Sequence, residues 1–212
     1  MAVQGKAGVW HGRSLWRQSR SPANMPRMEP LVLETARLRL RPFARDFSDL
    51  DELNAIQSDP EHMRFYPHPF SMEETRAWIQ RCLDHGDRFG YSLLAVQDRA
   101  TGQFLGNVGL HHQSVDQVDE LEIGWSVTPS RAREGIATEA AAACRDWAFA
   151  RVEVDHLVAL VRPENAASCR VAERIGMTVW KETLHNAALQ WRHLVYRVDR
   201  PEPGPATASA TA

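Results

Sequence analysis

The run of residues 121–140, LEIGWSVTPSRAREGIATEA, combines residue types that could bind an anion. A strand-like stretch of alternating apolar residues leads through a short turn into an Ala-rich stretch with helical spacing. The first turn of a helix carries unpaired N–H groups and a partial positive charge, so the backbone from Arg133 to Ala137 could hold a pyrophosphate. Gly135 lets the backbone approach a ligand closely, and Thr138 adds a hydroxyl. The same features also fit an ordinary strand-to-helix turn.

The segments that must position this turn follow one another in a clear order. Alternating or short apolar runs predict strands at residues 37–43, 91–97, 104–111, 121–127, 156–161, 178–183 and 192–198. Helical spacing predicts one helix after Asp46, one opened by a Ser71–Glu74 capping box, the Ala-rich helix, and one that stops at Gly176. This order predicts an α+β domain with antiparallel hairpins, in which the Ala-rich helix is a crossover between the fourth and fifth strands.

Length and composition fit a single domain with tails. The chain has 212 residues, of which 43% are hydrophobic and 25% are charged, and it is long enough for one substantial core. We expect residues 31–199 to form the domain. We expect residues 1–30 to be a disordered or spurious extension, with Met25 or Met28 as the true start, and residues 200–212 to be a disordered tail.

Charge and cysteine usage exclude several classes of partner. The net charge is −2, but residues 1–28 hold five basic and no acidic side chains, so residues 29–212, with 20 basic and 27 acidic ones, carry −7. We therefore expect no nucleic-acid or membrane partner, and phosphate binding must be local, with charge from Arg131 and Arg133. No apolar run approaches the roughly 20 residues of a membrane span. Three scattered cysteines and no paired histidine motif indicate a cytoplasmic protein that needs no metal.

Two spaced motifs resemble the GNAT acetyltransferases, and within them the ribosomal-protein alanine acetyltransferases. Residues 132–140, AREGIATEA, are similar to the acyl-CoA loop Gln/Arg-x-x-Gly-x-Gly/Ala with Thr-Glu-Ala after it, although Ala132 and Arg133 depart from that group's usual residues. Residues 163–177, PENAASCRVAERIGM, resemble Pro-x-Asn-x-x-Ser-x-x-Val-x-Glu-Lys-x-Gly-Phe, and residues 34–41, ETARLRLR, resemble the group's first strand. The resemblance implies a mixed, mostly antiparallel central sheet flanked by about four helices.

The resemblance also implies acetyl-CoA as cosubstrate and a set of residues that contact it. Asn165 is implied to contact the pantetheine arm or an ordered water, and Ser168 to lie near the thioester sulfur. Many family members place a Tyr four residues after Ser168, but Ala172 stands there, so Ser168 or water must protonate the leaving thiolate. Considered locally, Asn165 could be only a helix N-cap and Ser168 only a first-turn residue. The expected cofactor contacts are Trp125, Ser126, Val127, Arg131, Arg133, Glu134, Gly135, Ile136, Ala137, Thr138 and Asn165.

Acetyl transfer to an amine requires a proton acceptor and a group that stabilises an oxyanion. Glu122 is the first candidate base and Glu120 the second, and alternation places both on one side of their strand, although both could instead face solvent. Backbone N–H groups of residues 125–127 match the oxyanion donors of the family, with Gly124 as a bulge that parts the fourth and fifth strands. The expected catalytic residues are therefore Glu122, Ser168 and Asn165.

The loop between the first two helices would border the amine in a GNAT fold. Arg64 and Tyr66 are the expected substrate contacts, with His62 and His68 beside them, unless this is simply a polar surface loop. We expect direct attack in a ternary complex, on a protein N-terminus or a small-molecule amine, by a monomer or homodimer. The alternative is a non-catalytic acyl-CoA sensor, because the usual Tyr is absent.

Overall fold

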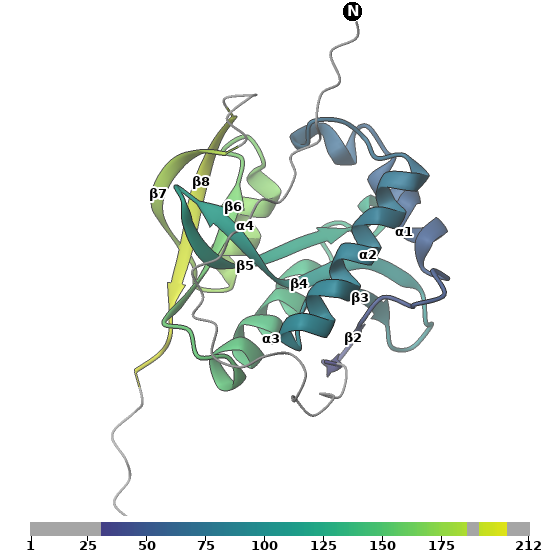
Figure 1. The fold of residues 1–212 in the computed structure, drawn as a ribbon, viewed down its shortest axis with the longest axis horizontal. Helices are drawn as coiled ribbons and strands as arrows, with labels where there is room; N and C mark the ends of the chain where they lie inside the picture. Colours follow the sequence, from purple (N-terminus) through teal and green to yellow (C-terminus); the bar gives the residue numbers. More distant parts are fainter. Residues whose placement is uncertain (1–30, 186–190, 203–212) are drawn as a thin grey trace, which may run out of the picture.

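One eight-stranded sheet, in the order β1-β2-β3-β4-β5-β6-β8-β7, organises the protein (Figure 1). The computed structural model describes residues 31–185 and 191–202. Its strands are β1 (Leu33–Glu34), β2 (Leu38–Arg41), β3 (Leu93–Asp98), β4 (Phe104–Val115), β5 (Val118–Val127), β6 (His156–Val161), β7 (Thr178–His185) and β8 (Trp191–Asp199). The helices are α1 (Leu50–Gln57), α2 (Met72–Phe89), α3 (Ile136–Arg151) and α4 (Ala166–Arg174), with 3₁₀ turns η2 (His62–Phe65) and η3 (Pro129–Arg131).

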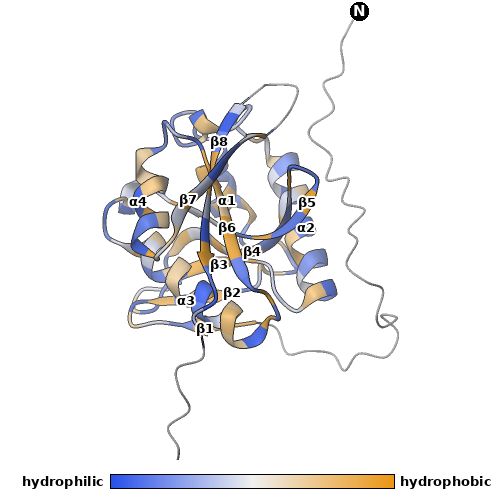
Figure 2. Cartoon of the chain, turned by 90° about the vertical axis from the view of Figure 1, so that its left-hand side faces the viewer, coloured by the Kyte–Doolittle hydropathy of each residue, from blue (hydrophilic) through white to orange (hydrophobic). Residues whose placement is uncertain are grey.

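The predicted α+β order is confirmed, with β1 as an additional short edge strand. In the described part of the chain, β5 and β6 pair in parallel and the other neighbours pair antiparallel. α3 connects these two parallel strands, as the crossover prediction requires. Figure 2 shows α3 and α4 on one side of the strands and α2 on the other.

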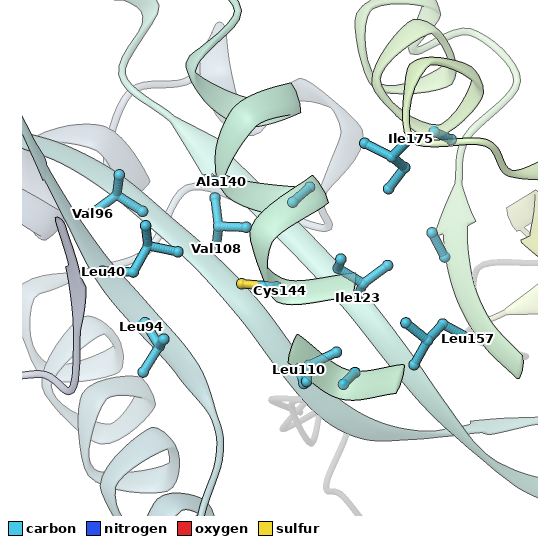
Figure 3. Packing of buried hydrophobic residues seen from close by; sticks show 14 of the residues in the cluster. Leu40, Leu94, Val96, Val108, Leu110, Ile123, Ala140, Cys144, Leu157 and Ile175 are labelled. Carbon is cyan, nitrogen blue, oxygen red and sulfur yellow. The ribbon is translucent and has the colours of Figure 1, made fainter. Parts of the chain in front are cut away.

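Alternation along the strands supplies a core to each helical layer. Leu94 and Val96 belong to the cluster that packs under α3 and α4, while Ala95 between them belongs to the cluster under α1 and α2. On α3, the fully buried Ala140 and the buried Cys144 lie over Val108 and its neighbours (Figure 3). Small side chains at these helix positions let the helix approach the sheet closely, so the start of α3 is held rigidly against β4 and β5.

The β4–β5 hairpin is longer than the sequence predicted. We expected residues 114–119 to separate the strands, but the turn is only Asp116 and Gln117, with φ angles of 50° and 70°. Two successive positive φ values are typical of a tight primed hairpin turn. Asp116 is bound by Lys181 at 2.7 Å and by the hydroxyl of Thr183, both on β7. The hairpin tip therefore reaches the far edge of the sheet. A small buried cluster of Val115, Val158 and Val195 packs between the hairpin and these last strands.

The parallel strands β5 and β6 share one register pair, Glu122 with Val158, and then part. Beyond that pair, the Leu160 N–H donates to the side-chain Oε1 of Glu122 at 3.0 Å, instead of to a β5 carbonyl. The prediction of a bulge at Gly124 is wrong, because β4 and β5 stay in register through it. The gap comes from the divergence of β6, whose other edge pairs with β8 over its whole length.

The folded unit extends one residue beyond the expected boundary at 199. Arg200 donates from its backbone N–H to Asp155 and from its side chain to the carbonyls of Phe149, Val152 and Val154, which closes the C-terminal end of α3. The expected N-terminal extension and residues 203–212 lie outside the described residues. None of the helices within 31–185 and 191–202 has the length and apolar character needed to cross a bilayer.

Candidate active site

The N-terminus of α3 presents backbone donors that the helix itself does not use. Gly135 is the N-cap residue, with a left-handed φ of 80°, and none of the described side chains caps the helix there. The first helical bond runs from Glu139 N–H to the Gly135 carbonyl, at 2.9 Å. The N–H groups of Ile136, Ala137 and Thr138 therefore have no helical acceptor. The structure therefore has at this end of α3 the unpaired amides on which the predicted anion site depends.

The loop before Gly135 is held by its own side chains. Arg131 donates from Nε to both carboxylate oxygens of Glu134, at 2.8 and 2.7 Å, and also contacts Gln103 and Asp98. Arg131 thus stabilises the loop conformation, and its guanidinium is engaged within the protein. Arg133 is exposed and has a φ of 69°, a conformation that glycine adopts without strain.

Glu122 is a buried carboxylate at the gap between β5 and β6. Its residue is 7% exposed, Oε1 accepts the Leu160 N–H, and Oε2 lies 3.2 Å from Nε2 of His111, its cross-strand partner on β4. A Cβ at Gly124 would come within 3.3 Å of the His111 ring, so glycine there leaves room for this imidazole. Glu120, which is 8% exposed, contacts Nε2 of His156 at 2.8 Å. The alternative that both carboxylates face solvent is therefore wrong.

Ser168 reaches the gap from the α4 side. The indole Nε1 of Trp125 on β5 donates to Ser168 Oγ at 3.3 Å. The side-chain oxygen of Asn165 accepts the Ser168 N–H at 3.1 Å, so Asn165 is the N-cap of α4, while its side-chain amide NH₂ can still donate. Ala172 is completely buried and, as an alanine, has no hydroxyl that could take part in proton transfer. The structure thus brings Ser168 and its N-cap residue Asn165 next to Trp125, which lies on the same strand as Glu122.

The loop after α1 closes the other side of β5. His62 Nε2 lies 2.8 Å from Oγ of Ser126, and burial lowers the pKa of His62 below its ordinary value. Tyr66 is 46% exposed overall, but the surrounding protein, and to a lesser extent the Glu122 carboxylate, raises the pKa of its hydroxyl. Tyr66 is therefore near Glu122. Arg64 pairs with Glu61 at 2.7 Å and lies over the Phe65 ring.

Several residues of the site were missed by sequence reasoning. His111 is one, and buried His193 is another: burial lowers the pKa of His193, while the nearby Glu122 carboxylate acts in the opposite direction. The β4–β5 pairs, including His111 with Glu122, are symmetric about the Asp116–Gln117 turn. Correct placement of that turn would have identified the His111 partner. For His193, on β8, the sequence carried no such signal.

Chemically, the gap offers a buried carboxylate on one side, a serine hydroxyl on the other, and free helix amides at its end. This set suits a ligand with an anionic portion and a reacting group that exchanges protons with its surroundings. Within the described residues, no group of three or more His, Cys, Asp or Glu side chains is arranged to hold a metal ion.

Comparison with known proteins identifies the family. A family model described as an acetyltransferase (GNAT) domain matches residues 37–178. YkkB of Bacillus subtilis (strain 168) is 36% identical over 145 residues, which are 68% of this chain and 84% of YkkB. An acetyltransferase from Agrobacterium tumefaciens str. C58 is 31% identical, with a TM-score of 0.68 over 79% of this chain and 94% of its own.

A more distant solved structure shares the fold and contains the cofactor. RimL, a ribosomal L7/L12 alpha-N-protein acetyltransferase in complex with coenzyme A, is 19% identical, with a TM-score of 0.64 over 80% of this chain and 98% of its own. The family model covers the loop of residues 131–135 that precedes α3, called the cofactor loop below, together with the gap and α4, so the match includes the elements that form the site. The chain belongs to the GNAT acetyltransferase family.

Proposed function

We propose that this protein transfers an acetyl group from acetyl-CoA to a primary amine, by direct attack in a ternary complex. Acetyl-CoA supplies the activated acetyl thioester. The observation that carries the proposal is the buried Glu122 carboxylate, held by the Leu160 N–H at the gap that Ser168 faces from the other side. Two proton-exchanging groups on opposite sides of one gap suit a reaction in which an amine loses a proton and a thiolate gains one.

The residues at the N-terminus of α3 fit the phosphate portion of coenzyme A. The amides of Ile136, Ala137 and Thr138 have no helical acceptor, and the left-handed Gly135 leaves no side chain between them and a ligand. Arg133 adds an exposed positive charge beside them. Arg131 and Glu134 act indirectly, because their mutual ion pair fixes the loop.

Along the gap, residues of β5 and α4 orient the acetyl thioester and protonate the leaving thiolate. The β5 backbone from Trp125 to Val127 borders the gap, where N–H groups can donate to the acetyl carbonyl oxygen. Asn165 caps α4 and offers its side-chain amide to the pantetheine arm. Ser168, positioned by its hydrogen bonds to Trp125 and Asn165, is the hydroxyl that donates a proton to the leaving thiolate.

Glu122 accepts the proton of the attacking amine. His111 and the Leu160 N–H fix the orientation of the carboxylate, and Tyr66 borders it on the amine side. The acceptor is either a protein N-terminus or a small-molecule amine. Two kinds of amine are common in proteins: the α-amino group, with a pKa near 8, and the lysine side chain, with a pKa of about 10.4. The α-amino group therefore loses its proton more readily at neutral pH.

Binding and turnover, measured separately, test this proposal. The purified protein is titrated calorimetrically with coenzyme A, and thiol release from acetyl-CoA is then followed with a panel of small amines and N-terminal peptides. We expect binding and amine-dependent thiol release with at least one acceptor class. Absence of any coenzyme A binding would overturn the proposal, and tight binding without turnover across the panel would identify a sensor instead.

A further inference from the structure

A side-chain network links the turn between β1 and β2 to the cofactor loop. Oε1 of Glu139, in the first turns of α3, accepts hydrogen bonds from the Thr35 hydroxyl at 2.5 Å and the Arg37 N–H at 3.1 Å. Oε2 of Glu139 is bound by Nε and Nη2 of Arg37, at 2.7 and 2.6 Å. The third guanidinium nitrogen, Nη1, donates to the carbonyl of Glu134 at 3.0 Å. Arg37 therefore binds both α3 and the loop that precedes it.

The bond to the Glu134 carbonyl determines how the next peptide is oriented. The described peptide bonds are all trans, and in a trans peptide the C=O and the following N–H point in opposite directions. With its carbonyl fixed on Arg37, the Glu134–Gly135 peptide must direct the Gly135 N–H away from Arg37. If the peptide were reversed, a carbonyl oxygen would replace that donor and would repel an anion. The Arg37 contact thus favours the orientation that an anion requires.

Charge leads to the same conclusion. Glu139 lies within about one helical turn of the amides that would meet a phosphate, where an uncompensated carboxylate would repel it. The Arg37 guanidinium neutralises Glu139 at hydrogen-bond distance. Each of the three guanidinium nitrogens of Arg37 already donates to Glu139 or to the Glu134 carbonyl, so Arg37 holds these two protein groups together.

We infer that Arg37 is a positioning residue of the cofactor site: anchored by Glu139, it holds the Glu134–Gly135 peptide so that the start of α3 presents its amides to the diphosphate of coenzyme A. The inference rests on the proposed function and adds a component to it. Thr35 and Arg37, in the Glu34–Arg41 segment, thus provide hydrogen-bond partners for Glu139, about 100 residues further along the chain.

The test is calorimetric titration of the full chain and its variants with coenzyme A and with dephospho-coenzyme A, which keeps the diphosphate but lacks the 3′-phosphate. Arg37→Ala is expected to weaken binding of both compounds about tenfold. Arg39→Ala is the matched control, because Arg39 is an exposed arginine two residues further along the chain, in β2, and the coenzyme A affinity of this variant should stay within twofold of the wild type.

Glu139→Gln separates positioning from direct contact. It removes a negative charge but also loosens the anchor of Arg37, so positioning predicts weaker binding, whereas a directly contacting Arg37 would be released and binding would tighten. If Arg37→Ala melts before the titration, Arg37→Lys replaces it, since lysine keeps the charge but cannot hold Glu139 and the Glu134 carbonyl together; binding should again weaken.

Three results would overturn the inference: unchanged affinity in the Arg37 variants, a loss seen with coenzyme A but not with dephospho-coenzyme A, or tighter binding by Glu139→Gln. Each of these presupposes that the wild-type protein binds coenzyme A. A wild-type protein that binds neither compound refutes the proposed function itself, so the two failures are distinguishable.

Discussion

Replacing Glu122 by Gln tests the proposed base with little change in shape. A glutamine oxygen can still accept the Leu160 N–H, so the β5–β6 gap should keep its geometry. What is lost is the ability to accept a proton. Removing a general base typically costs 100-fold to 10,000-fold, so we expect kcat/KM at pH 7 to fall at least about 100-fold.

Folding should contribute little to that loss. Exchanging a charge-assisted hydrogen bond for a neutral one costs about 1 kcal/mol. For a domain of this size, about 1 kcal/mol lowers Tm by about 2–4 °C. Thermal unfolding of the variant therefore shows whether the site is still intact when the rate is measured.

The pH dependence gives the sharper readout. An α-amino acceptor with a pKa near 8 is about one-tenth neutral at pH 7 and about nine-tenths neutral at pH 9, so the need for a base diminishes as the pH rises. The ratio of wild-type to Glu122→Gln activity, measured by thiol release, should fall by up to about tenfold between these pH values. Glu120→Gln is the matched control, from the same strand and equally buried, and should retain most activity. Full activity of Glu122→Gln at every pH would refute the role of Glu122.

Three further changes probe other parts of the structure. Gly135→Asp places a side chain and a negative charge at a φ of 80°, so coenzyme A affinity should drop at least tenfold in titration; an unchanged Kd would mean that the phosphates bind elsewhere. Ser168→Ala should lower kcat about tenfold or more while the Kd for coenzyme A stays within about threefold, and an equal loss in both would assign Ser168 to binding. Asp49→Asn breaks the buried pair with Arg41 and should destabilise the fold by about 3 kcal/mol at pH 7 in urea unfolding. Burial raises the pKa of Asp49, but Arg41 and the Ala44 N–H together lower it by more, so the net shift is downward. This stability is therefore fully present above pH 4 and decreases as the pH falls through the lowered folded-state pKa; a deficit that grows on acidification would contradict this.

Local patterns in the sequence predicted much of the fold and the local backbone geometry of the candidate site. The Ser71–Glu74 capping box is present with both of its hydrogen bonds, at 3.2 and 2.8 Å, because a cap depends on residues three apart in the chain. The strand, turn and Ala-rich helix of residues 121–140 formed as predicted for the same reason. Helix amides at Gly135 follow from local backbone geometry, which residue type and spacing encode directly.

The partners of these residues depend on distant parts of the chain, and the tertiary structure decided them. Glu122 has the same chemistry in any strand, but its hydrogen bond from the Leu160 N–H depends on β6, which diverges from β5 beyond their one register pair. His111 meets Glu122 because the hairpin turns at Asp116 and Gln117, two residues that carry no glycine signal for positive φ. Contacts between residues about 100 positions apart, such as Arg37 with Glu139, follow from packing of whole elements, which no local spacing records.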